Sequence, residues 1–405
     1  MVPTEGGVRM MKSILAVAGP RWRKDLAEAS PFIRFCEPED AVLTLAQEPA
    51  PWNLVILDRE ECGLWFEALL ELTVNDTVGR TPALVLDDHP APASVARFSG
   101  ESGPLALKNA CHRTIIAGRG RTADPGLIPP AEIAQGRISN RYQPIMRIND
   151  GHITGAEVLA RVLAADGRAA GPEALLNAMH DPQSALSLTR MVMERAVSDH
   201  RLGHLGGMQL MFGFNLPLDV LLHPSLIRVV EEIRLAAELE PSSISFELTE
   251  SQPVEDISRV RTTVTILREA GYRLALDDIT PATRNLAALI DLPVRAAKLD
   301  RSVVCDAAGS AEIRRFIRIV ANSLDREGKA LIAEGIEDDA TLRLMSELGV
   351  TYAQGFLVAR PLPAAALRPW RQNWSGIAPT GIARIGVKPA LHPVTDIRTA
   401  LSGVR

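Results

Sequence analysis

The feature that most constrains the fold is a regular alternation of short apolar runs and helical patterns between residues 142 and 363. Short apolar runs of this kind are typical of buried strands, and longer patterns of period 3.6 are typical of helices. The eight strand-like runs are residues 143–147, 152–159, 209–215, 243–248, 273–277, 296–299, 330–333 and 352–356. Eight strands with helices between most of them predict a single (β/α)8 barrel. A doubly wound open sheet is the alternative, but no glycine-rich phosphate loop favours it.

Polar side chains stand where these predicted strands end. Asp277 and Asp278 follow the apolar run 274–276, and Lys298 lies in the next run, after a helical pattern that Pro293 ends. The active site of such a barrel is built from residues at the carboxyl ends of its strands. The polar residues at these ends are Glu157, Asn215, Glu247, Glu250, Asp277, Asp278, Lys298, Glu334, Glu337 and Gln354. So many carboxylates at one barrel mouth would repel one another unless cations neutralised them, so the pattern predicts two divalent metals.

Residues 12–118 show a second, shorter alternation. The strand candidates are residues 13–18, 32–35, 54–57, 83–86 and 114–117. The helical stretches are residues 24–29, 39–46, 64–72 and 94–98. This alternation predicts a small parallel α/β sandwich.

The layout of this sandwich resembles a two-component receiver domain, with Asp58 at the position of the phosphoacceptor. The residues around that position differ from the receiver pattern. Ala18-Gly19-Pro20-Arg21 stands where a receiver has paired acids, Asp87-Asp88 where it has a small hydroxyl residue, and Gly118-Arg119-Gly120 where it has Lys-Pro. A phosphoryl group on Asp58 would therefore lack its counter-charges. We expect a degenerate receiver that serves dimerisation or contact with a protein partner.

The composition and the positions of glycine and proline indicate domain boundaries, and the net charge limits the expected partners. We expect a disordered start (1–11), the receiver-like domain (12–118), a glycine- and proline-rich linker (119–130), the barrel domain (131–368) and a carboxyl-terminal extension (369–405). A net charge of −5 offers no general basic surface, so bulk nucleic acid is not an expected partner. No apolar run approaches the length that spans a bilayer, and a cytoplasmic protein is expected.

Eight short motifs in the barrel region occur in a specific order. They are Tyr142-Gln-Pro-Ile145, Glu157-Val-Leu-Ala-Arg161, Phe214-Asn-Leu-Pro217, Glu247-Leu-Thr-Glu250, Asp277-Asp278, Lys298-Leu-Asp-Arg301, Ala333-Glu-Gly-Ile-Glu337 and Gln354-Gly-Phe-Leu-Val-Ala-Arg-Pro361. Together they resemble the ordered motifs of EAL-domain cyclic di-GMP phosphodiesterases, over residues 131–368. The Glu-Ala-Leu that names the family is Glu157-Val158-Leu159 here, which keeps the first and last residues.

The resemblance implies a modified (β/α)8 TIM-like barrel that hydrolyses cyclic di-GMP to linear pGpG with two divalent cations, Mg²⁺ or Mn²⁺. The implied metal ligands are Glu157, Asn215, Glu247, Asp277 and Asp278. The implied catalytic residues are Lys298, which would position the attacking water, with Glu334 and Gln354. The implied contacts to the dinucleotide are Gln143, Leu159, Arg161, Asp278 and Pro361. A homodimer is also implied.

One segment departs from the family pattern. Active members usually follow the aspartate pair with Phe-Gly-Thr-Gly-Tyr-Ser-Ser, whereas this chain has Ile279-Thr280-Pro281-Ala282-Thr283-Arg284-Asn285. Both glycines are absent, and Pro281 fixes a backbone angle that glycine would leave free. Glu250, the implied anchor of this loop, is retained, but its usual loop partners are not.

Three hypotheses follow. The first is a working phosphodiesterase, which the intact ligand set and Lys298 favour. The second is a receptor that binds cyclic di-GMP with little or no turnover and signals to a partner through the receiver-like domain, which the altered loop favours. The third is an interaction protein that binds no nucleotide, against which the retained Gln143 and Arg161 argue.

Overall fold

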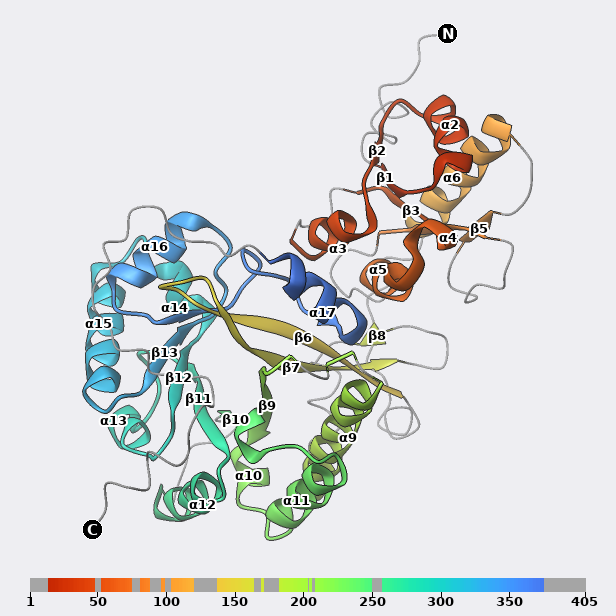
Figure 1. The fold of residues 1–405 in the computed structure, drawn as a ribbon. Coiled ribbons are helices and arrows are strands. Elements are labelled where there is room, and N and C mark those ends of the chain that lie inside the picture. The colour runs from red at the N-terminus through yellow and green to blue at the C-terminus, as the bar shows by residue number, and fades with distance from the viewer. Residues whose placement is uncertain are drawn as a thin grey trace.

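The computed structural model describes residues 14–47, 52–74, 81–87, 96–98, 103–119, 137–163, 169–170, 182–202, 204–205, 208–249 and 257–374. Its strands form two separate sheets (Figure 1). One sheet belongs to the amino-terminal unit, which extends from β1 (Ile14–Val17) to α6 (Gly103–Arg119). The other belongs to the barrel, which extends from β6 (Arg137–Arg147) to α17 (Ala364–Asn373).

Five parallel strands form the amino-terminal sheet, in the order β2-β1-β3-β4-β5. After β1, their bounds are Ile33–Phe35 for β2, Leu54–Asp58 for β3, Ala83–Leu86 for β4 and Ala96–Phe98 for β5. Because β1, β3 and β4 are buried along their whole length, both faces of the sheet need a cover of helices. Helices α2 (Pro20–Ala29) and α6 cover one face, and α3 (Pro38–Gln47) and α5 (Phe66–Val74) cover the other. The short α4 (Arg59–Cys62) and η1 (Gly63–Trp65) connect β3 to α5.

Two predicted elements of this unit are wrong. Residues 114–117, expected to be a strand, lie inside α6, and residues 96–98, expected to be helical, form β5. The apolar run at Ile115 looks like a strand locally, but Leu107, Cys111 and Ile115 recur every four residues and are buried together as one face of a helix. The parallel α/β sandwich itself is present, and its likeness to a receiver domain stays a prediction. The short helix expected at residues 131–135 falls outside the described residues.

Eight strands of the second sheet close into a barrel in the order β6-β14-β13-β12-β11-β10-β9-β7, because β6 also pairs with β7. After β6, their bounds are Ile153–Leu163 for β7, Met211–Pro217 for β9, Ile244–Thr249 for β10, Arg273–Ile279 for β11, Ala296–Leu299 for β12, Ala330–Ala333 for β13 and Tyr352–Ala353 for β14. The eight predicted runs therefore all contain strands. The other seven strands of the barrel run parallel to one another, whereas β6 is antiparallel to β7 and to β14. Two short strands, β8 (Ala169–Ala170) and β15 (Leu362–Pro363), extend the sheet.

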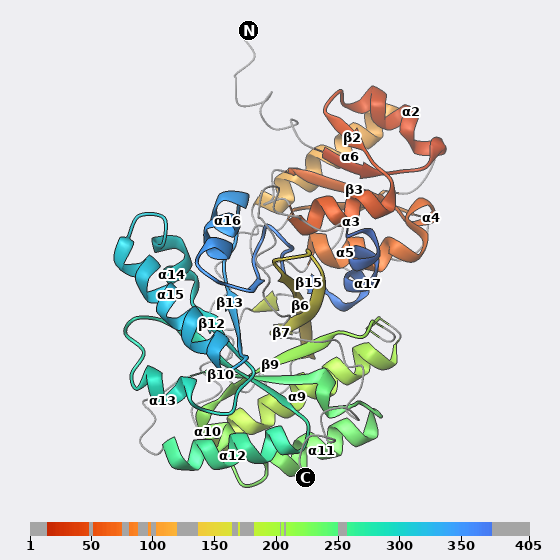
Figure 2. The same cartoon turned by 60° about the vertical axis from the view of Figure 1, so that its left-hand side comes forward.

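Helices surround this barrel (Figures 1 and 2). They are α9 (Pro182–Arg201), α10 (Leu218–Leu221), α11 (Leu226–Ala236), α12 (Ile257–Glu269), α13 (Leu286–Ile290), α14 (Arg301–Asp306), α15 (Ala311–Arg326), α16 (Asp339–Glu347) and α17, with the short η2 (Pro241–Ser243) before β10. Ser310 and Asp338 begin α15 and α16 by accepting hydrogen bonds from backbone N–H groups three residues on. Gly271, at φ +96°, turns the chain from α12 into β11 in a conformation that favours glycine.

The amino-terminal unit packs on the barrel through α17, which lies between the two (Figure 2). The N–H of Arg360 donates to the carbonyl of Ala46 in α3 over 2.9 Å. Trp370 of α17 is fully buried, and it belongs to an apolar cluster that contains Leu69 of α5 and Leu362 of β15. The two units therefore share a continuous apolar core.

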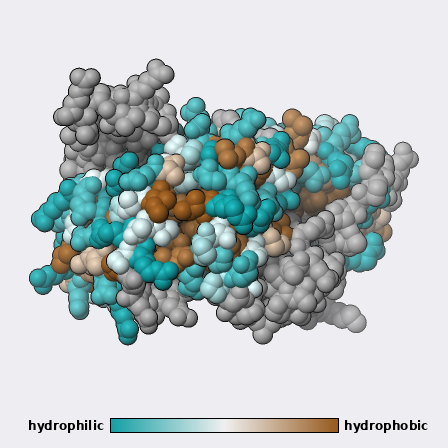
Figure 3. Space-filling view, turned by 90° about the horizontal axis from the view of Figure 1, so that it is seen from below, coloured by the Kyte–Doolittle hydropathy of each residue, from teal (hydrophilic) through white to brown (hydrophobic). Residues whose placement is uncertain are grey.

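No helix within the described ranges is long and apolar enough to cross a membrane. Seen from below, the surface combines polar residues with an apolar area near the centre of the view (Figure 3).

Candidate active site

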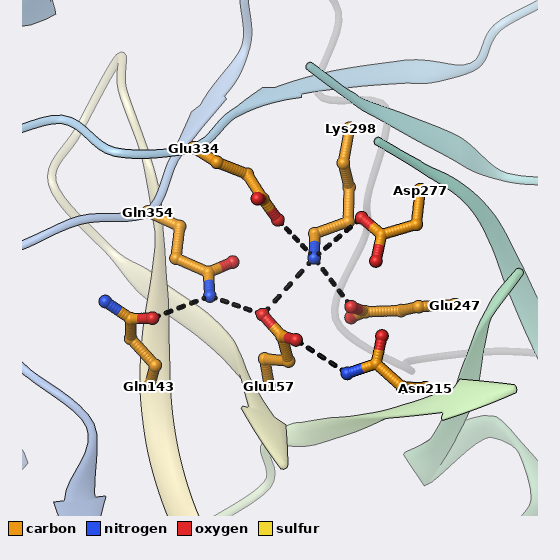
Figure 4. Close-up of polar contacts among 8 residues, drawn as sticks. All are labelled: Gln143, Glu157, Asn215, Glu247, Asp277, Lys298, Glu334 and Gln354. Carbon is orange, nitrogen blue, oxygen red and sulfur yellow. Dashed lines mark hydrogen bonds and ion pairs between the residues drawn. The ribbon is translucent and has the colours of Figure 1, made fainter. Parts of the chain in front are cut away.

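Eight polar side chains converge at the mouth of the barrel (Figure 4). Each lies on, or directly follows, a different strand of the barrel, and Gln143 of β6 lies opposite Glu157 of β7. They are Gln143 on β6, Glu157 on β7, Asn215 on β9, Glu247 on β10, Asp277 on β11, Lys298 on β12, Glu334 directly after β13 and Gln354 directly after β14. The structure therefore brings together most of the polar residues that the sequence suggested.

Lys298 occupies the centre of this cluster and is fully buried. Its Nζ lies 2.6 Å from Glu247 Oε2, 3.1 Å from Asp277 Oδ1 and 3.3 Å from Glu157 Oε2. It also pairs with Glu334. One ammonium thus faces four carboxylates. The excess of negative charge favours the binding of further cations.

Glu157 links the lysine to the two amide side chains of the site. Its Oε1 accepts a hydrogen bond from Asn215 Nδ2 at 2.8 Å, and its Oε2 accepts one from Gln354 Nε2 at 2.6 Å. Gln354 Nε2 also donates to Gln143 Oε1 at 3.1 Å, and Gln143 in turn donates to the carbonyl of Ala359 at 3.3 Å. The carboxylate is therefore held in one orientation by a chain of amides.

Opposite effects act on the pKa values of Lys298 and Glu157. Burial disfavours the charged ammonium of Lys298, but the four surrounding carboxylates outweigh burial and raise its pKa well above the usual value. Burial likewise disfavours the charged form of Glu157, yet the charge of Lys298 and the hydrogen bonds from Gln354 and Asn215 hold its pKa below the usual value. Both groups are charged at neutral pH.

The other carboxyls of the cluster have raised pKa values. Burial, followed by the charges of Asp277 and Glu157, raises the pKa of Glu334 to about 8. Burial, followed by the charge of Asp277, raises the pKa of Asp278 to about 6. Burial is also the main cause of the raised pKa of Glu247. Burial disfavours the charged form of these carboxyls, whereas a bound cation favours it.

The residues present fit divalent metals. Asp277, Asp278 and Glu334 each offer a carboxylate oxygen, and these three oxygens lie within 4.8 Å of one another. The carboxylates, together with the Asn215 amide, form the set of oxygen ligands that Mg²⁺ and Mn²⁺ prefer. Gln354 Oε1 is buried and has no hydrogen-bond partner among the residues that the structure describes, so it is available to a bound water.

Gly213 is a site residue that the sequence analysis missed. It lies on β9, and a Cβ atom at this position would stand 2.0 Å from Glu247 Oε1. Any larger residue would therefore displace the Glu247 carboxylate. A glycine inside a strand-like run is the available signal, because it often marks the close approach of another group.

The residues implied to contact the dinucleotide lie along β6, β7 and the segment before β15. Leu159 and Arg161 follow Glu157 at intervals of two, so all three share one face of β7. Leu159 pairs in register with Arg141 of β6, and Pro361 immediately precedes β15, which also pairs with β6. These positions form one edge of the mouth.

Asp278 lies at the edge of the cluster, where it is exposed and adopts a positive φ of +53°, and its carboxylate lies beside those of Asp277 and Glu334. Glu337 is exposed and pairs with Arg301 at 2.6 Å. Glu250 falls outside the described residues.

Asp58 ends β3 in the amino-terminal unit and has a different environment. Its Oδ2 accepts a hydrogen bond from Gly19 N at 3.0 Å, and its Oδ1 accepts one from Glu60 N at 3.2 Å. The neighbouring Arg59 pairs with Asp87 at 2.6 Å. Both Asp58 oxygens are thus bound to backbone N–H groups.

Comparison with known proteins identifies the barrel region. Residues 129–361 match the family model for the EAL domain. Cyclic di-GMP phosphodiesterase NbdA of Pseudomonas aeruginosa is 30% identical over 232 residues, which cover 57% of this chain and 30% of that protein. Probable cyclic di-GMP phosphodiesterase PdeB of Escherichia coli is 28% identical over 249 residues, which cover 60% of this chain and 47% of that protein. The match therefore spans less than half the length of either relative.

Solved structures agree with the fold. A complex of the PaMucR phosphodiesterase with c-di-GMP has a TM-score of 0.52 and 25% identity, and the match covers 56% of this chain and 93% of that chain. The Bacillus subtilis YkuI protein, solved with c-di-GMP and calcium, has a TM-score of 0.52 and 21% identity, with 58% and 59% covered. Because the EAL domain model matches more than half of the 405 residues, this protein belongs to the EAL domain family.

Proposed function

We propose that this protein is a cyclic di-GMP-specific phosphodiesterase that hydrolyses its substrate to linear pGpG at a site with two divalent cations. The observation that carries the proposal is the arrangement of Glu157, Glu247, Asp277 and Glu334 around the buried Lys298. A site that only bound a nucleotide would not need this full hydrolytic set. The names of the relatives and the c-di-GMP in the PaMucR complex support the same substrate.

The proposed metal ligands are Glu157, Asn215, Glu247, Asp277 and Asp278, with Glu334 beside them. Bound divalent cations supply Lewis-acid activation of a water and stabilise the leaving oxygen of an in-line displacement at phosphorus. Mg²⁺ or Mn²⁺ fits these oxygen donors.

The side chains of this protein would then position the reacting groups and balance the charge of the site. The Lys298 ammonium donates hydrogen bonds and can orient the attacking water toward phosphorus while it offsets the charge of the carboxylates. Gln354 fixes the orientation of Glu157 and offers its free Oε1 to a water. Arg161 is proposed to pair with a phosphate of the dinucleotide, since a guanidinium can bind two phosphate oxygens at once.

A second function is a receptor for cyclic di-GMP with little or no turnover. The altered residues after Asp278 favour this alternative, because a displaced supporting segment weakens a metal cage whose ligands are all present. We further propose a homodimer, contact with a protein partner through the receiver-like unit, and the domain boundaries given by the sequence.

The test is hydrolysis of cyclic di-GMP by the full chain with Mg²⁺ or Mn²⁺, followed by chromatography of the linear product. Glu157→Gln removes one ligand charge at nearly constant shape. Glu194→Gln removes an exposed carboxylate on α9 and serves as the matched control. We expect turnover in the wild type and in the control and none in Glu157→Gln.

Three results would contradict this proposal. Nucleotide binding without product would support the receptor, and absence of both binding and product would leave an interaction protein. Equal turnover in Glu157→Gln would show that hydrolysis occurs elsewhere.

A further inference from the structure

The segment after the aspartate pair departs most from the family pattern, yet it forms an ordered turn. Residues 280–283 have the sequence Thr-Pro-Ala-Thr, and the N–H of Thr283 donates to the carbonyl of Thr280 at 3.1 Å. This is the hydrogen bond of a β-turn. Pro281 occupies the second position of the turn, where the fixed φ of proline is favourable. Pro281 is therefore compatible with the local backbone.

Two threonine hydroxyl groups form further hydrogen bonds inside the same turn. Thr283 Oγ1 accepts a hydrogen bond from Thr280 N at 2.9 Å, and Thr280 Oγ1 accepts one from Ala282 N at 3.2 Å. The two hydroxyl oxygens lie 3.4 Å apart. Side chains of Thr and Ser stabilise turns in this way because they bond to nearby backbone groups. The segment thus satisfies these backbone groups with its own side chains.

The turn begins two residues after Asp278, whose backbone is strained. Asp278 has φ +53°, a conformation that a residue other than glycine adopts only when its surroundings hold it there. On the amino-terminal side of Asp278, Leu276 pairs in register with Ala297 of β12, and the register shifts between Leu276 and Ile279. On its carboxyl-terminal side, the peptide unit between Ile279 and Thr280 makes two hydrogen bonds: Asp300 N donates to the carbonyl of Ile279 at 3.3 Å, and Thr280 N donates to Thr283 Oγ1. The backbone that carries Asp278 is therefore held on both sides.

We propose that Thr283 is a positioning residue for the proposed metal site. Its hydroxyl closes the turn through Thr280 N and so maintains the left-handed backbone of Asp278. That backbone places the Asp278 carboxylate beside Asp277 and Glu334. In this chain the two threonines provide an internal support for the acid pair. The inference rests on the proposed function, because it assigns a support to the ligands of that site.

The test compares Thr283→Val with Thr283→Ser in the full chain. Valine keeps the shape of threonine but removes the oxygen, whereas serine restores the oxygen. Thr265→Val on α12 is the matched control, because it removes an exposed hydroxyl that bonds to the backbone at 2.8 Å far from the strand ends in sequence. Mn²⁺ binding is measured by titration calorimetry without nucleotide, and amide hydrogen exchange is measured over residues 278–284.

We expect Thr283→Val to weaken Mn²⁺ binding about tenfold, which corresponds to the loss of one hydrogen bond. The same variant should exchange the Thr280 amide about tenfold faster, because exchange requires opening of that hydrogen bond. Thr283→Ser and Thr265→Val should both resemble the wild type.

Equal Mn²⁺ affinity in the wild type and in Thr283→Val would overturn the inference, as would a failure of serine to restore binding. A wild type that binds no Mn²⁺ would instead overturn the proposed two-metal function and, with it, the role of Thr283 toward the metal. Hydrogen exchange separates the two failures, since slow exchange at Thr280 in such a wild type would show that the turn forms without a metal site.

Discussion

Two aspartates lie at or near the carboxyl ends of parallel strands in this molecule, and their surroundings give them opposite chemistry. Asp58 ends β3, and both of its oxygens accept backbone hydrogen bonds, from Gly19 and Glu60. Asp277 lies near the end of β11 and faces Lys298, with three further carboxylates around the same ammonium. The position at a strand end is common to both residues, so it does not by itself make a site.

The two aspartates differ in how much of the local negative charge is balanced. At Asp58 two N–H dipoles satisfy a single carboxylate, and Arg59 beside it is paired with Asp87. At the barrel mouth one ammonium balances only part of the charge of four carboxylates. Unbalanced buried charge favours the binding of cations, whereas a satisfied carboxylate contributes to local stability.

The largest expected effect follows the loss of the central charge of the barrel. Lys298→Met should lower turnover of cyclic di-GMP by at least about a thousandfold, because the ammonium both balances the carboxylates and orients the water. In metal-free buffer the same change should lower the free energy of unfolding by about 3–5 kcal/mol, since it leaves buried carboxylates unpaired. Urea unfolding with a chelator checks this value, and unchanged stability would show that the ion pairs are unimportant.

The next effect concerns the space for the Glu247 carboxylate. Gly213→Ala introduces a Cβ atom where only 2.0 Å separates it from Glu247 Oε1, so the carboxylate must move. We expect turnover to fall about a hundredfold, as displacements of about 1 Å in catalytic groups do. Gly309→Ala is the control, because its Cβ would meet no atom closer than 4.0 Å. Equal activity of the two variants would contradict the close approach.

The dependence of stability on pH should report the raised pKa values of the barrel carboxyls. Burial and neighbouring charges raise the pKa of Glu334 to about 8 and that of Asp278 to about 6, from usual values of 4.5 and 3.8. The folded protein therefore holds more protons than the unfolded chain between these values, and its stability falls as pH rises from about 4 to 8. Metal binding should strengthen over the same interval. Chemical unfolding without metal at several pH values checks the sign, and rising stability would contradict it.

The smallest effect is expected at Asp58. Asp58→Asn should leave turnover within about twofold of the wild type and lower stability by about 1–2 kcal/mol, because one oxygen that accepts a backbone hydrogen bond is lost. Incubation with a small phosphoryl donor should give no phosphorylated protein. Stable labelling at Asp58, or a large loss of turnover in Asp58→Asn, would remove the distinction between the two aspartates.

The sequence predicted the barrel well because its strands are short apolar runs, and their polar residues occur at the ends that a parallel barrel brings together. It failed where burial by distant residues decides the local structure. Thr114 and Ile115 look like part of a strand, but the helical face that they share with Leu107 and Cys111 packs on the sheet. The antiparallel direction of β6 depends on its two neighbours in space, and no local pattern specifies it.

Contacts between residues far apart in the chain could also not be predicted from the sequence. The need for glycine at position 213 appears only when β10 places Glu247 beside it. From the sequence, Pro281 and the missing glycines were expected to alter the loop. In the structure, the hydroxyl of Thr283 helps to form a turn in which the φ of proline is favourable. The polar residues that meet at the barrel mouth were predictable from the sequence, and the contacts that support them were not.

The most direct test of the central claim is anomalous diffraction from crystals of the full chain soaked in Mn²⁺. We predict two manganese peaks at the barrel mouth, one among Glu157, Asn215 and Glu247 and one among Asp277, Asp278 and Glu334. No peak should occur beside Asp58. Absence of manganese from the barrel, or an equal peak beside Asp58, would contradict the claim that unbalanced charge at the barrel mouth makes the site.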